Sequence, residues 1–371
     1  MNKKKFDKIM PNNLHRQFNL HKDEYEKKAI EVLNSGWYIL GKEVESFEKE
    51  WANYIGTKYC VGLASGLDAL WIAFRILGIK ENDEVIVCSN DYIACVMGVT
   101  INGATPVFVE PDEYYNIDVN KIEEKINDKT KAILAVHLYG QSCNMTKIMK
   151  LAKKYNLYVV EDCAQSHGNH WESKVTGSIG DIGCFSFYPS KGCGAFGDGG
   201  CITTNNPEIA KKAYTFRNYG SEKRYHNEVV GTNSRLDELQ AGLLRVKLKH
   251  MDELNKERVD LANRYNNEIN NDLIVKPKVQ KEADSTWHQY VIRCKYRDEL
   301  IEYLDKNNIG TLIHYPIPPH LSEAYEYLGF KVGDFPIAEK YANEVLSLPM
   351  YNGMTKEEQD RVIDAINRFK I

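Results

Sequence analysis

The chain has 371 residues, of which 43% are apolar and 27% are charged, and its formal net charge is −4. This composition excludes an intrinsically disordered chain. The mild negative charge gives no overall attraction to nucleic acid or to an anionic membrane, so we expect neither as a partner. No stretch approaches the ~20 apolar residues of a membrane span, and the basic N-terminus lacks the apolar run of a secretory signal.

The nine cysteines contain no Cys-x-x-Cys pair, which argues against a zinc knuckle or a disulfide framework. Several lie inside apolar runs, such as Val87-Cys88 and Ile292-Arg293-Cys294. We therefore expect buried free thiols and a cytoplasmic location, where thiols stay reduced.

From Val44 to about Thr204, helical patterns alternate with short apolar runs. Apolar residues at helical spacing predict helices over 44–54 and 67–77, which Gly56 and Gly78 end. Apolar runs predict strands at 85–87, 107–109, 132–138 and 157–160, with a helix around 148–155 between the last two. Strands that are apolar throughout and alternate with helices are typical of a parallel sheet covered on both faces.

The pattern changes after Asn233. Apolar residues at helical spacing from Leu236 predict one long helix that extends past Tyr265. A smaller α+β segment follows, with a strand near 287–294, a helix near 298–304 and a last helix that the capping box Thr355-x-x-Glu358 opens. We expect an N-terminal arm over residues 1–30, a large domain over 31–250 and a small domain over 251–371.

Ligands of open α/β sheets bind at the carboxyl ends of the strands. Asp162 follows the strand at 157–160, Lys191 and a glycine-rich stretch follow the run at 184–187, and Ser65-Gly66 precedes the helix at 67–77. These groups suit pyridoxal phosphate, because a lysine forms its Schiff base and a carboxylate keeps its pyridine nitrogen protonated. The amides of a helix N-terminus bind its phosphate.

Each feature alone has a plainer interpretation. A strand-end Asp162 is more often a cap or turn residue, a lone Lys191 is more often solvated, and Ser65 is more often a simple N-cap. The order Gly-x-x-x-x-Gly-Lys-Ser/Thr of a Walker loop is absent. His137 and His167 have no clustered second and third ligand, so we expect structural histidines and no metal site.

Longer blocks of sequence carry a more specific pattern. They include Glu161-Asp162-Cys163-Ala164-Gln165, and together they cover residues 35–41, 64–70, 161–168, 185–191, 197–200, 231–241 and 314–318. This pattern resembles the DegT/StrS-type family of nucleotide-sugar aminotransferases, which use pyridoxal phosphate. The resemblance implies the type I (aspartate aminotransferase) α/β fold, with a mostly parallel central sheet covered by helices and a smaller α+β C-terminal domain.

Position by position, the resemblance implies roles for individual residues. Lys191 would form the Schiff base and shuttle the proton, and Asp162 would pair with the pyridine nitrogen. To act as a base Lys191 must be neutral, so we expect its pKa to be lowered. Further cofactor contacts would come from Gln165, Ser186, the amides of Gly66 and Leu67, and the ring of Tyr92.

The resemblance also implies a homodimer with shared active sites. Asn233 matches a residue that reaches the cofactor phosphate across the dimer interface, although Asn233 could instead be the N-cap of a helix that begins at Ser234 or Leu236. Two positions depart from the family pattern: Asp91 replaces a common threonine, and Gly192-Cys193-Gly194 replaces Asn-Leu-Gly. The expected substrate-binding residues are Tyr38, Tyr225, His314, Tyr315 and His320.

The implied reaction transfers an amino group from an amino acid, L-glutamate by resemblance, to a keto sugar linked to a nucleotide. Blocks 36–41 and 225–231 look most like the family's subgroup that aminates C3 of a dTDP-3-keto-6-deoxyhexose. The alternative is C4 of a dTDP-, UDP- or GDP-linked 4-keto-6-deoxyhexose. Family members that dehydrate the sugar carry histidine in place of Lys191, and a non-catalytic regulator would lack Lys191 or Asp162. Both residues are present.

Overall fold

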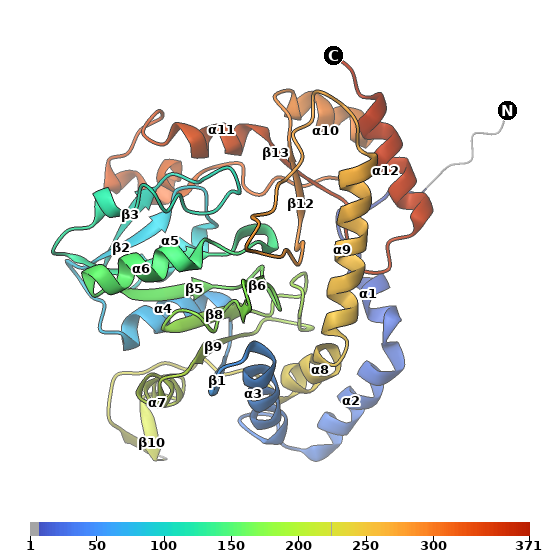
Figure 1. Cartoon of the computed structure of the whole chain (residues 1–371). Coiled ribbons are helices and arrows are strands. Elements are labelled where there is room, and N and C mark those ends of the chain that lie inside the picture. The colour runs from blue at the N-terminus through green and yellow to red at the C-terminus, as the bar shows by residue number, and fades with distance from the viewer. Residues whose placement is uncertain (1–6, 224) are drawn as a thin grey trace.

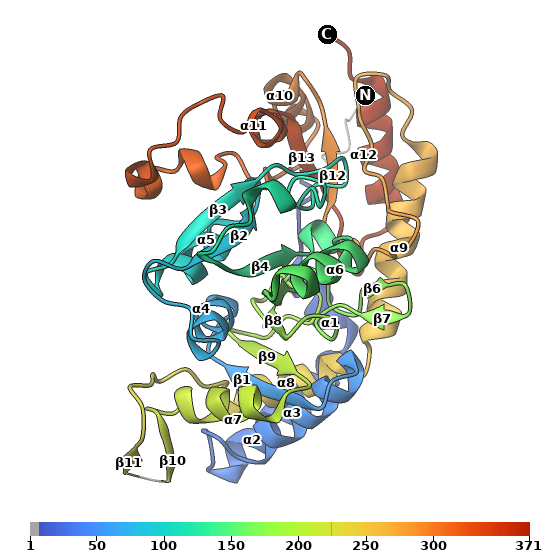
Figure 2. The ribbon, with the colours of Figure 1, turned by 60° about the vertical axis from the view of Figure 1, so that its left-hand side comes forward.

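A computed structural model describes residues 7–223 and 225–371. A seven-stranded sheet forms the centre of the molecule (Figures 1 and 2). The strand order is β1-β9-β8-β5-β4-β2-β3. The strands from β3 to β8 in this order pair in parallel, and β9 pairs antiparallel with both β8 and β1. The strands are β1 (Tyr59–Leu63), β2 (Glu84–Cys88), β3 (Thr105–Val109), β4 (Thr130–Val136), β5 (Tyr158–Asp162), β8 (Ile182–Ser186) and β9 (Gly200–Thr204). The predicted, mostly parallel sheet is confirmed.

Helices surround this sheet and build the C-terminal part of the chain. The α-helices are α1 (Leu14–Leu20), α2 (Lys22–Ser35), α3 (Lys42–Ile55), α4 (Gly66–Ile76), α5 (Ile93–Thr100), α6 (Met145–Tyr155), α7 (Pro207–Phe216), α8 (Glu238–Leu248), α9 (Met251–Glu268), α10 (Arg297–Lys306), α11 (Pro336–Glu344) and α12 (Lys356–Arg368). Short 3-10 helices are η1 (Glu123–Lys125), η2 (Leu138–Gly140), η3 (Pro319–Leu321) and η4 (Glu323–Leu328). Paired short strands are β6 (His170–Trp171) with β7 (Lys174–Val175), β10 (Ser221–Lys223) with β11 (His226–Asn227), and β12 (Tyr290–Arg293) with β13 (Val345–Leu348).

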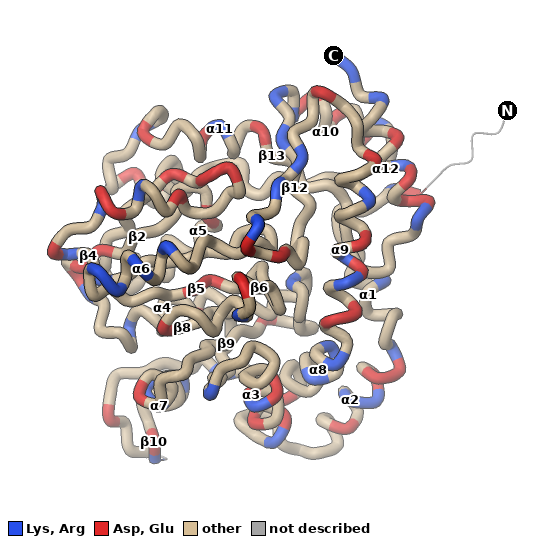
Figure 3. The backbone as a smooth tube through the Cα atoms, viewed as in Figure 1, with Lys and Arg blue, Asp and Glu red and all other residues tan. Residues whose placement is uncertain are grey.

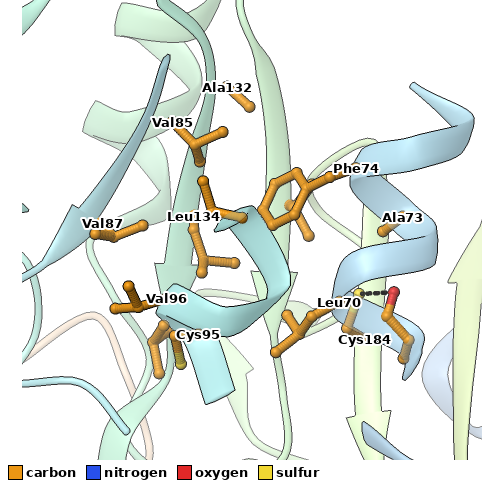
Figure 4. Packing of buried hydrophobic residues seen from close by; sticks show 14 of the residues in the cluster. Leu70, Ala73, Phe74, Val85, Val87, Cys95, Val96, Ala132, Leu134 and Cys184 are labelled. Carbon is orange, nitrogen blue, oxygen red and sulfur yellow. Dashed lines mark hydrogen bonds between the residues drawn. The ribbon is translucent and has the colours of Figure 1, made fainter. Parts of the chain in front are cut away.

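Both faces of the sheet are buried, as the continuous apolar strands predict. Successive side chains of a strand point to opposite faces, so Val85 and Val87 lie in the cluster that also contains residues of α4 and α5. Their neighbours Ile86 and Cys88 pack on the other face with α6. Figure 4 shows the ring of Phe74 pointing from α4 toward Leu134 of β4. Burial on both faces fixes the register of the sheet and therefore the positions of its strand ends.

Local sequence signals set several helix ends. Gly56 and Gly78 follow α3 and α4 with φ values of +83° and +84°, which suit glycine best. The capping box at α12 is confirmed: Thr355 Oγ accepts from the Glu358 amide at 3.2 Å, and Glu358 Oε2 accepts from the Thr355 amide at 2.9 Å. The glycine ends depend on backbone conformation and the capping box depends on hydrogen bonds within four residues. The local sequence is therefore enough to predict both.

The prediction of one long helix from Leu236 past Tyr265 is wrong. The structure has two helices, α8 and α9, with a break at Lys249 and His250. Met251 is fully buried in the cluster formed by α3 and α8, and Asp252 begins the acidic first turn that favours a new helix N-terminus. Tertiary packing therefore overrides the continuous apolar spacing.

The C-terminal part of the chain contributes to two cores. One contains side chains from α9, α10, α12, β12 and β13, and Ile9 of the N-terminal segment joins it and pairs with Ile309. Residues of α11, among them Ala338 and Tyr341, instead pack into the cluster of the central sheet. The domain boundary near residue 250 stays a prediction, because residues after it pack both into the C-terminal cluster and into the cluster of the central sheet.

Charged residues of both signs are interspersed along α2, α9 and α12 (Figure 3). Among residues 7–223 and 225–371, no helix combines the length and the apolar character that crossing a bilayer would require.

Glu161 of β5 is fully buried, and its carboxylate connects three segments of the large core. Oε1 accepts from the amides of Ile179 at 2.8 Å and Gly180 at 2.7 Å, and Oε2 accepts from the Gly177 amide at 2.9 Å. His137 Nδ1 accepts from the Cys143 amide, so its Nε2 carries the proton and donates to Oε2 at 3.0 Å. Burial alone would raise the pKa of Glu161, but these donors outweigh it and the pKa lies below its ordinary value.

We predict that Glu161→Gln lowers the free energy of unfolding by at least about 2 kcal/mol, because the amide group would face backbone donors. Since the folded pKa of Glu161 is depressed, its contribution is complete above the unfolded pKa and is lost as pH falls through the folded pKa. The difference between wild type and variant in urea unfolding should therefore shrink in acid. Glu124→Gln, an exposed site with the same charge change, is the control. Equal stability of all three proteins at neutral pH would contradict this role.

Candidate active site

A cavity of about 390 Å³ lies at the carboxyl ends of β5 and β8, beside the N-terminus of α4. This is where ligands of open α/β sheets are expected. Nine of the residues predicted to bind cofactor or substrate line it: Gly66, Leu67, Tyr92, Asp162, Gln165, Ser186, Lys191, His314 and Tyr315.

Asp162 ends β5 and is buried, with 7% of its surface exposed. Its Oδ1 accepts from the Ala164 amide at 2.9 Å, and its Oδ2 accepts from the Cys95 thiol at 3.3 Å. The side chain is therefore held in one orientation at the cavity wall. A fixed, buried carboxylate can keep a pyridine nitrogen protonated.

Lys191 lies in the loop after β8 and lines the same cavity. Its amide donates to the Tyr188 carbonyl at 2.8 Å, and the next turn is held by His167 Nδ1, which accepts from the Cys193 amide at 2.8 Å. Burial lowers the pKa of the Lys191 amine, and the negative charge of Asp162 offsets part of this effect. The expected direction is confirmed, and a lowered pKa favours the neutral amine that a base requires.

His167 shows a structural role in this loop. Burial lowers the pKa of His167 to about 3, so the ring is neutral at pH 7 and Nδ1 can accept the Cys193 amide. His137 likewise accepts a backbone amide and donates to Glu161. Both histidines thus hold polypeptide segments together.

The N-terminus of α4 forms the third wall of the cavity. Ser65 is the N-cap, as its plainer interpretation predicts, and Oγ accepts from the Asp68 amide at 3.1 Å. Gly66 then passes so close to β8 that an added Cβ would lie 2.5 Å from Ser186 Cβ. This contact places a hydroxyl beside the free amides of the first helical turn, which is an anion-binding arrangement.

The cavity therefore fits pyridoxal phosphate in each of its parts. Asp162 ends β5, where it suits the pyridine nitrogen, and Lys191 lies in the loop after the adjacent β8, where it suits the aldehyde carbon. The first turn of α4 together with Ser186 suits the phosphate.

The outer wall comes from the C-terminal part of the chain. Gln165 accepts from the Tyr139 amide at 2.8 Å and donates to the Tyr315 hydroxyl at 3.1 Å. His314 Nδ1 lies 2.7 Å from Ser347 Oγ and its Nε2 lies 2.9 Å from Gln289 Nε2, while burial lowers the pKa of His314 to about 4. His314 is thus neutral at pH 7, and the ring is fixed at the cavity entrance. The ring centre of Tyr92 lies 4.9 Å from that of Tyr315.

Three predicted residues lie outside this chain's cavity and are exposed. Tyr38 is 51% exposed and donates to the Leu33 carbonyl at 3.1 Å, and Tyr225 is 84% exposed. Asn233 is exposed and pairs with Asn218, and α8 begins only at Glu238 after the N-cap Asp237. The interpretation of Asn233 as an N-cap is therefore wrong.

His320 is also outside the cavity, and its prediction as a substrate residue needs correction for this chain. Only 1% of its surface is exposed, and its ring packs against Phe335 with the ring centres 4.8 Å apart. Nε2 lies 3.2 Å from Glu339 Oε1. The structure thus places His320 in a packed aromatic cluster, because η3 turns it inward.

The cavity residues that the sequence analysis missed include Cys95, His288 and Gln289. Cys95 stands three residues after Tyr92, a spacing that puts both on one face at the start of α5, so helical geometry could have indicated it. Asp162, which accepts from the Cys95 thiol, also lies near the buried Asp91, whose Oδ1 has no hydrogen-bond partner among the described residues. Burial and the charge of Asp162 raise the pKa of Asp91 well above its ordinary value. No local pattern marks His288 and Gln289, which precede β12.

Comparison with known proteins gives consistent results. A sequence model described as the DegT/DnrJ/EryC1/StrS aminotransferase family matches residues 19–367. A dTDP-3-amino-3,6-dideoxy-alpha-D-galactopyranose transaminase of Aneurinibacillus thermoaerophilus is 51% identical, over 95% of this chain and 98% of that protein. A dTDP-3-amino-3,4,6-trideoxy-alpha-D-glucose transaminase of Streptomyces venezuelae is 44% identical, over 93% and 92%. The crystal structure of S. venezuelae DesV in complex with a ketimine intermediate superposes with a TM-score of 0.95 at 42% identity, covering 98% of each chain. The predicted fold class is confirmed.

The close approach of α4 to β8 gives a direct test of the phosphate site. We predict that Gly66→Ala weakens binding of pyridoxal phosphate at least about tenfold, or about 1.4 kcal/mol, because its methyl group must push Ser186 away. Titration of the apoprotein with the cofactor measures this, and circular dichroism checks folding. Gly192→Ala, whose Cβ would meet His167 Cβ at an ordinary 3.4 Å, should bind like wild type. Unchanged affinity of a folded Gly66→Ala protein would exclude this end of α4 as the phosphate site.

Proposed function

The chain belongs to the DegT/DnrJ/EryC1/StrS aminotransferase family, and we propose that it transfers an amino group from L-glutamate to C3 of a dTDP-linked 3-keto-6-deoxyhexose. One observation carries the proposal: Lys191 and Asp162 line one cavity in a chain that is 51% identical to a dTDP-3-amino-3,6-dideoxy-alpha-D-galactopyranose transaminase. The presence of both residues argues against a non-catalytic regulator and against sugar dehydration.

Bound pyridoxal phosphate supplies an electron sink for the negative charge that develops when a substrate carbon loses its proton. The chain's residues supply binding and proton transfer. The neutral amine of Lys191 takes the proton from the α-carbon of the amino-acid donor. In the second half of the reaction it gives a proton to C3 of the sugar. Asp162, held by Cys95 and the Ala164 amide, keeps the pyridine nitrogen protonated. Ser186 and the amides of Gly66 and Leu67 bind the phosphate.

The remaining substrate contacts divide between this chain and a partner. Gln165 would hydrogen-bond the phenolic oxygen of the cofactor, Tyr92 would pack on its ring, and His314 and Tyr315 at the entrance would contact the nucleotide sugar. All four line the cavity.

We infer a homodimer whose sites are shared. Asn233 and Tyr225 belong to the segment 225–233, where Val230 is 95% exposed. Tyr38 belongs to a second exposed apolar segment that includes Trp37, at 63%. Exposed apolar segments of this kind are typical of protein interfaces. A second copy of the chain would bury them and bring Asn233, Tyr38 and Tyr225 to the neighbouring cavity.

The cysteines support a cytoplasmic location. All nine are free and buried, which suits a reducing compartment.

A substrate panel tests the reaction. The purified enzyme with L-glutamate and pyridoxal phosphate should aminate a dTDP-3-keto-6-deoxyhexose faster than dTDP-, UDP- or GDP-linked 4-keto-6-deoxyhexoses, with products identified by mass spectrometry. Lys191→Ala should show only trace turnover while still binding the cofactor non-covalently. Preference for a 4-keto sugar would replace C3 by C4, and no amination of any sugar would overturn the proposed function.

Mixed dimers test the shared site. We predict that Asn233→Ala impairs the homodimer, because the phosphate loses a hydrogen-bond donor from the partner. Co-expression of Lys191→Ala and Asn233→Ala chains should then give mixed dimers with about half of wild-type activity, since one site carries both lesions and the other neither.

If Asn233 serves its own chain, each site of the mixed dimer carries one lesion and activity does not recover. A fully active Asn233→Ala homodimer would also contradict the prediction.

A further inference from the structure

A second cluster of ligand-bearing side chains lies where the N-terminal arm meets the break between α8 and α9. It consists of His21, which precedes α2, Glu24 in the first turn of α2, and His250 at the break. None of these three residues lines the cavity of the proposed active site. Figure 1 shows α1 and α2 beside α8 and α9, so the cluster joins segments far apart in sequence.

The three side chains converge on the carboxylate of Glu24. Its Oε1 lies 3.0 Å from His250 Nε2 and 3.9 Å from His21 Nδ1, and the potential ligand atoms all lie within 4.8 Å of one another. The two imidazole rings are stacked, with centres 3.6 Å apart and planes at 11°. An imidazole nitrogen binds a metal ion in the plane of its ring, so one of the two stacked rings must rotate for both to bind the same ion.

These separations match the ligand spacing of a small transition-metal ion. Two ligands at about 2.0–2.1 Å from a tetrahedral zinc ion lie about 3.3 Å from each other, which is between the two measured separations. We propose that His21, Glu24 and His250 bind a divalent transition-metal ion, with zinc as the best match. Two imidazoles and one carboxylate form a ligand set that zinc uses, and the fourth position would hold water.

The surroundings of His250 support this assignment. Glu253 Oε2 lies 4.0 Å from His250 Nδ1, on the ring nitrogen that would not contact the ion. Ligating histidines commonly direct their second nitrogen at a carboxylate, which orients the ring and strengthens the ligand.

Charge balance and access also permit a cation. The positive end of α2 and the buried Lys247 nearby oppose it, and the carboxylates of Glu24 and Glu253 offset this repulsion. The side chain of Glu24 is 47% exposed, so an ion can enter from solution.

Another cluster of the described residues, His137 with Glu161 and Cys163, provides a contrast. There both carboxylate oxygens and both ring nitrogens already have protein hydrogen-bond partners. At the proposed site Glu24 Oε1 and His250 Nε2 form one hydrogen bond, which a bound ion would replace, and Glu24 is 47% exposed whereas Glu161 is fully buried.

An ion at this cluster would fasten the arm to the helix pair. His21 and Glu24 belong to the arm, whose Tyr25 packs against Leu243 and Val246 of α8. His250 belongs to the break that the helical spacing does not predict. Zinc binding should therefore stabilise the docked arm and raise the melting temperature.

Titration calorimetry of the tag-free, chelator-treated holoenzyme with zinc chloride tests the proposal. Wild type should bind one zinc ion per chain at this site and melt at a higher temperature with zinc. Glu24→Gln, which keeps the shape of an exposed side chain, and His250→Ala should each lower the affinity at least about tenfold and remove the thermal shift. His15→Ala, an exposed histidine on α1, is the matched control and should behave like wild type.

Absence of saturable zinc binding by wild type would overturn the proposal. Equal affinity in wild type, Glu24→Gln and His250→Ala would also overturn it, because the ion would then lie elsewhere. Circular dichroism of each variant separates loss of a ligand from loss of folding.

Discussion

The buried carboxylate of Glu161 is the constraint on which the active site depends. Its hydrogen bonds hold the Gly177–Gly180 turn and His137 against one face of β5. Since side chains alternate along a strand, anchoring Glu161 on that face directs the next residue, Asp162, to the opposite face and into the cavity. The same turn leads directly into β8, so this interaction also sets where that strand begins and where Lys191 follows.

Burial gives Lys191 and Asp162 their chemistry. Removing the lysine amine from water lowers its pKa, while the nearby carboxylate limits the shift. Among the described residues, Asp162 accepts hydrogen bonds from a thiol and from one backbone amide, which leaves it available to a pyridine nitrogen. Asp91, behind the cavity, lies where burial and the charge of Asp162 favour its neutral form. Asp162 thus accepts a hydrogen bond on each carboxylate oxygen, whereas Asp91 accepts one from the Cys88 amide on Oδ2 and its Oδ1 has no partner among the described residues.

A single chain supplies most of the residues that line the active-site cavity, and it also has exposed segments that do not line this cavity. The groups at the strand ends line the site, whereas Tyr38, Tyr225 and Asn233 lie on the surface. Local sequence could place these residues in blocks that resemble the family pattern but could not indicate which chain's cavity they face. Quaternary structure would decide that, since side chains at an interface are positioned by a second copy.

The sequence by itself determined the parallel strands β2, β3, β4, β5 and β8, the capping box, the glycines at helix ends and the residues at the carboxyl ends of β5 and β8, but it did not indicate the antiparallel strands β1 and β9. These features depend on alternation, spacing and hydrogen bonds within a few residues. Only the tertiary structure decided the break at His250, the inward turn of His320, the approach of Gly66 to Ser186 and the contribution of His288 and Gln289. Each of these depends on packing between segments far apart in sequence, and such contacts leave no periodic trace in the chain.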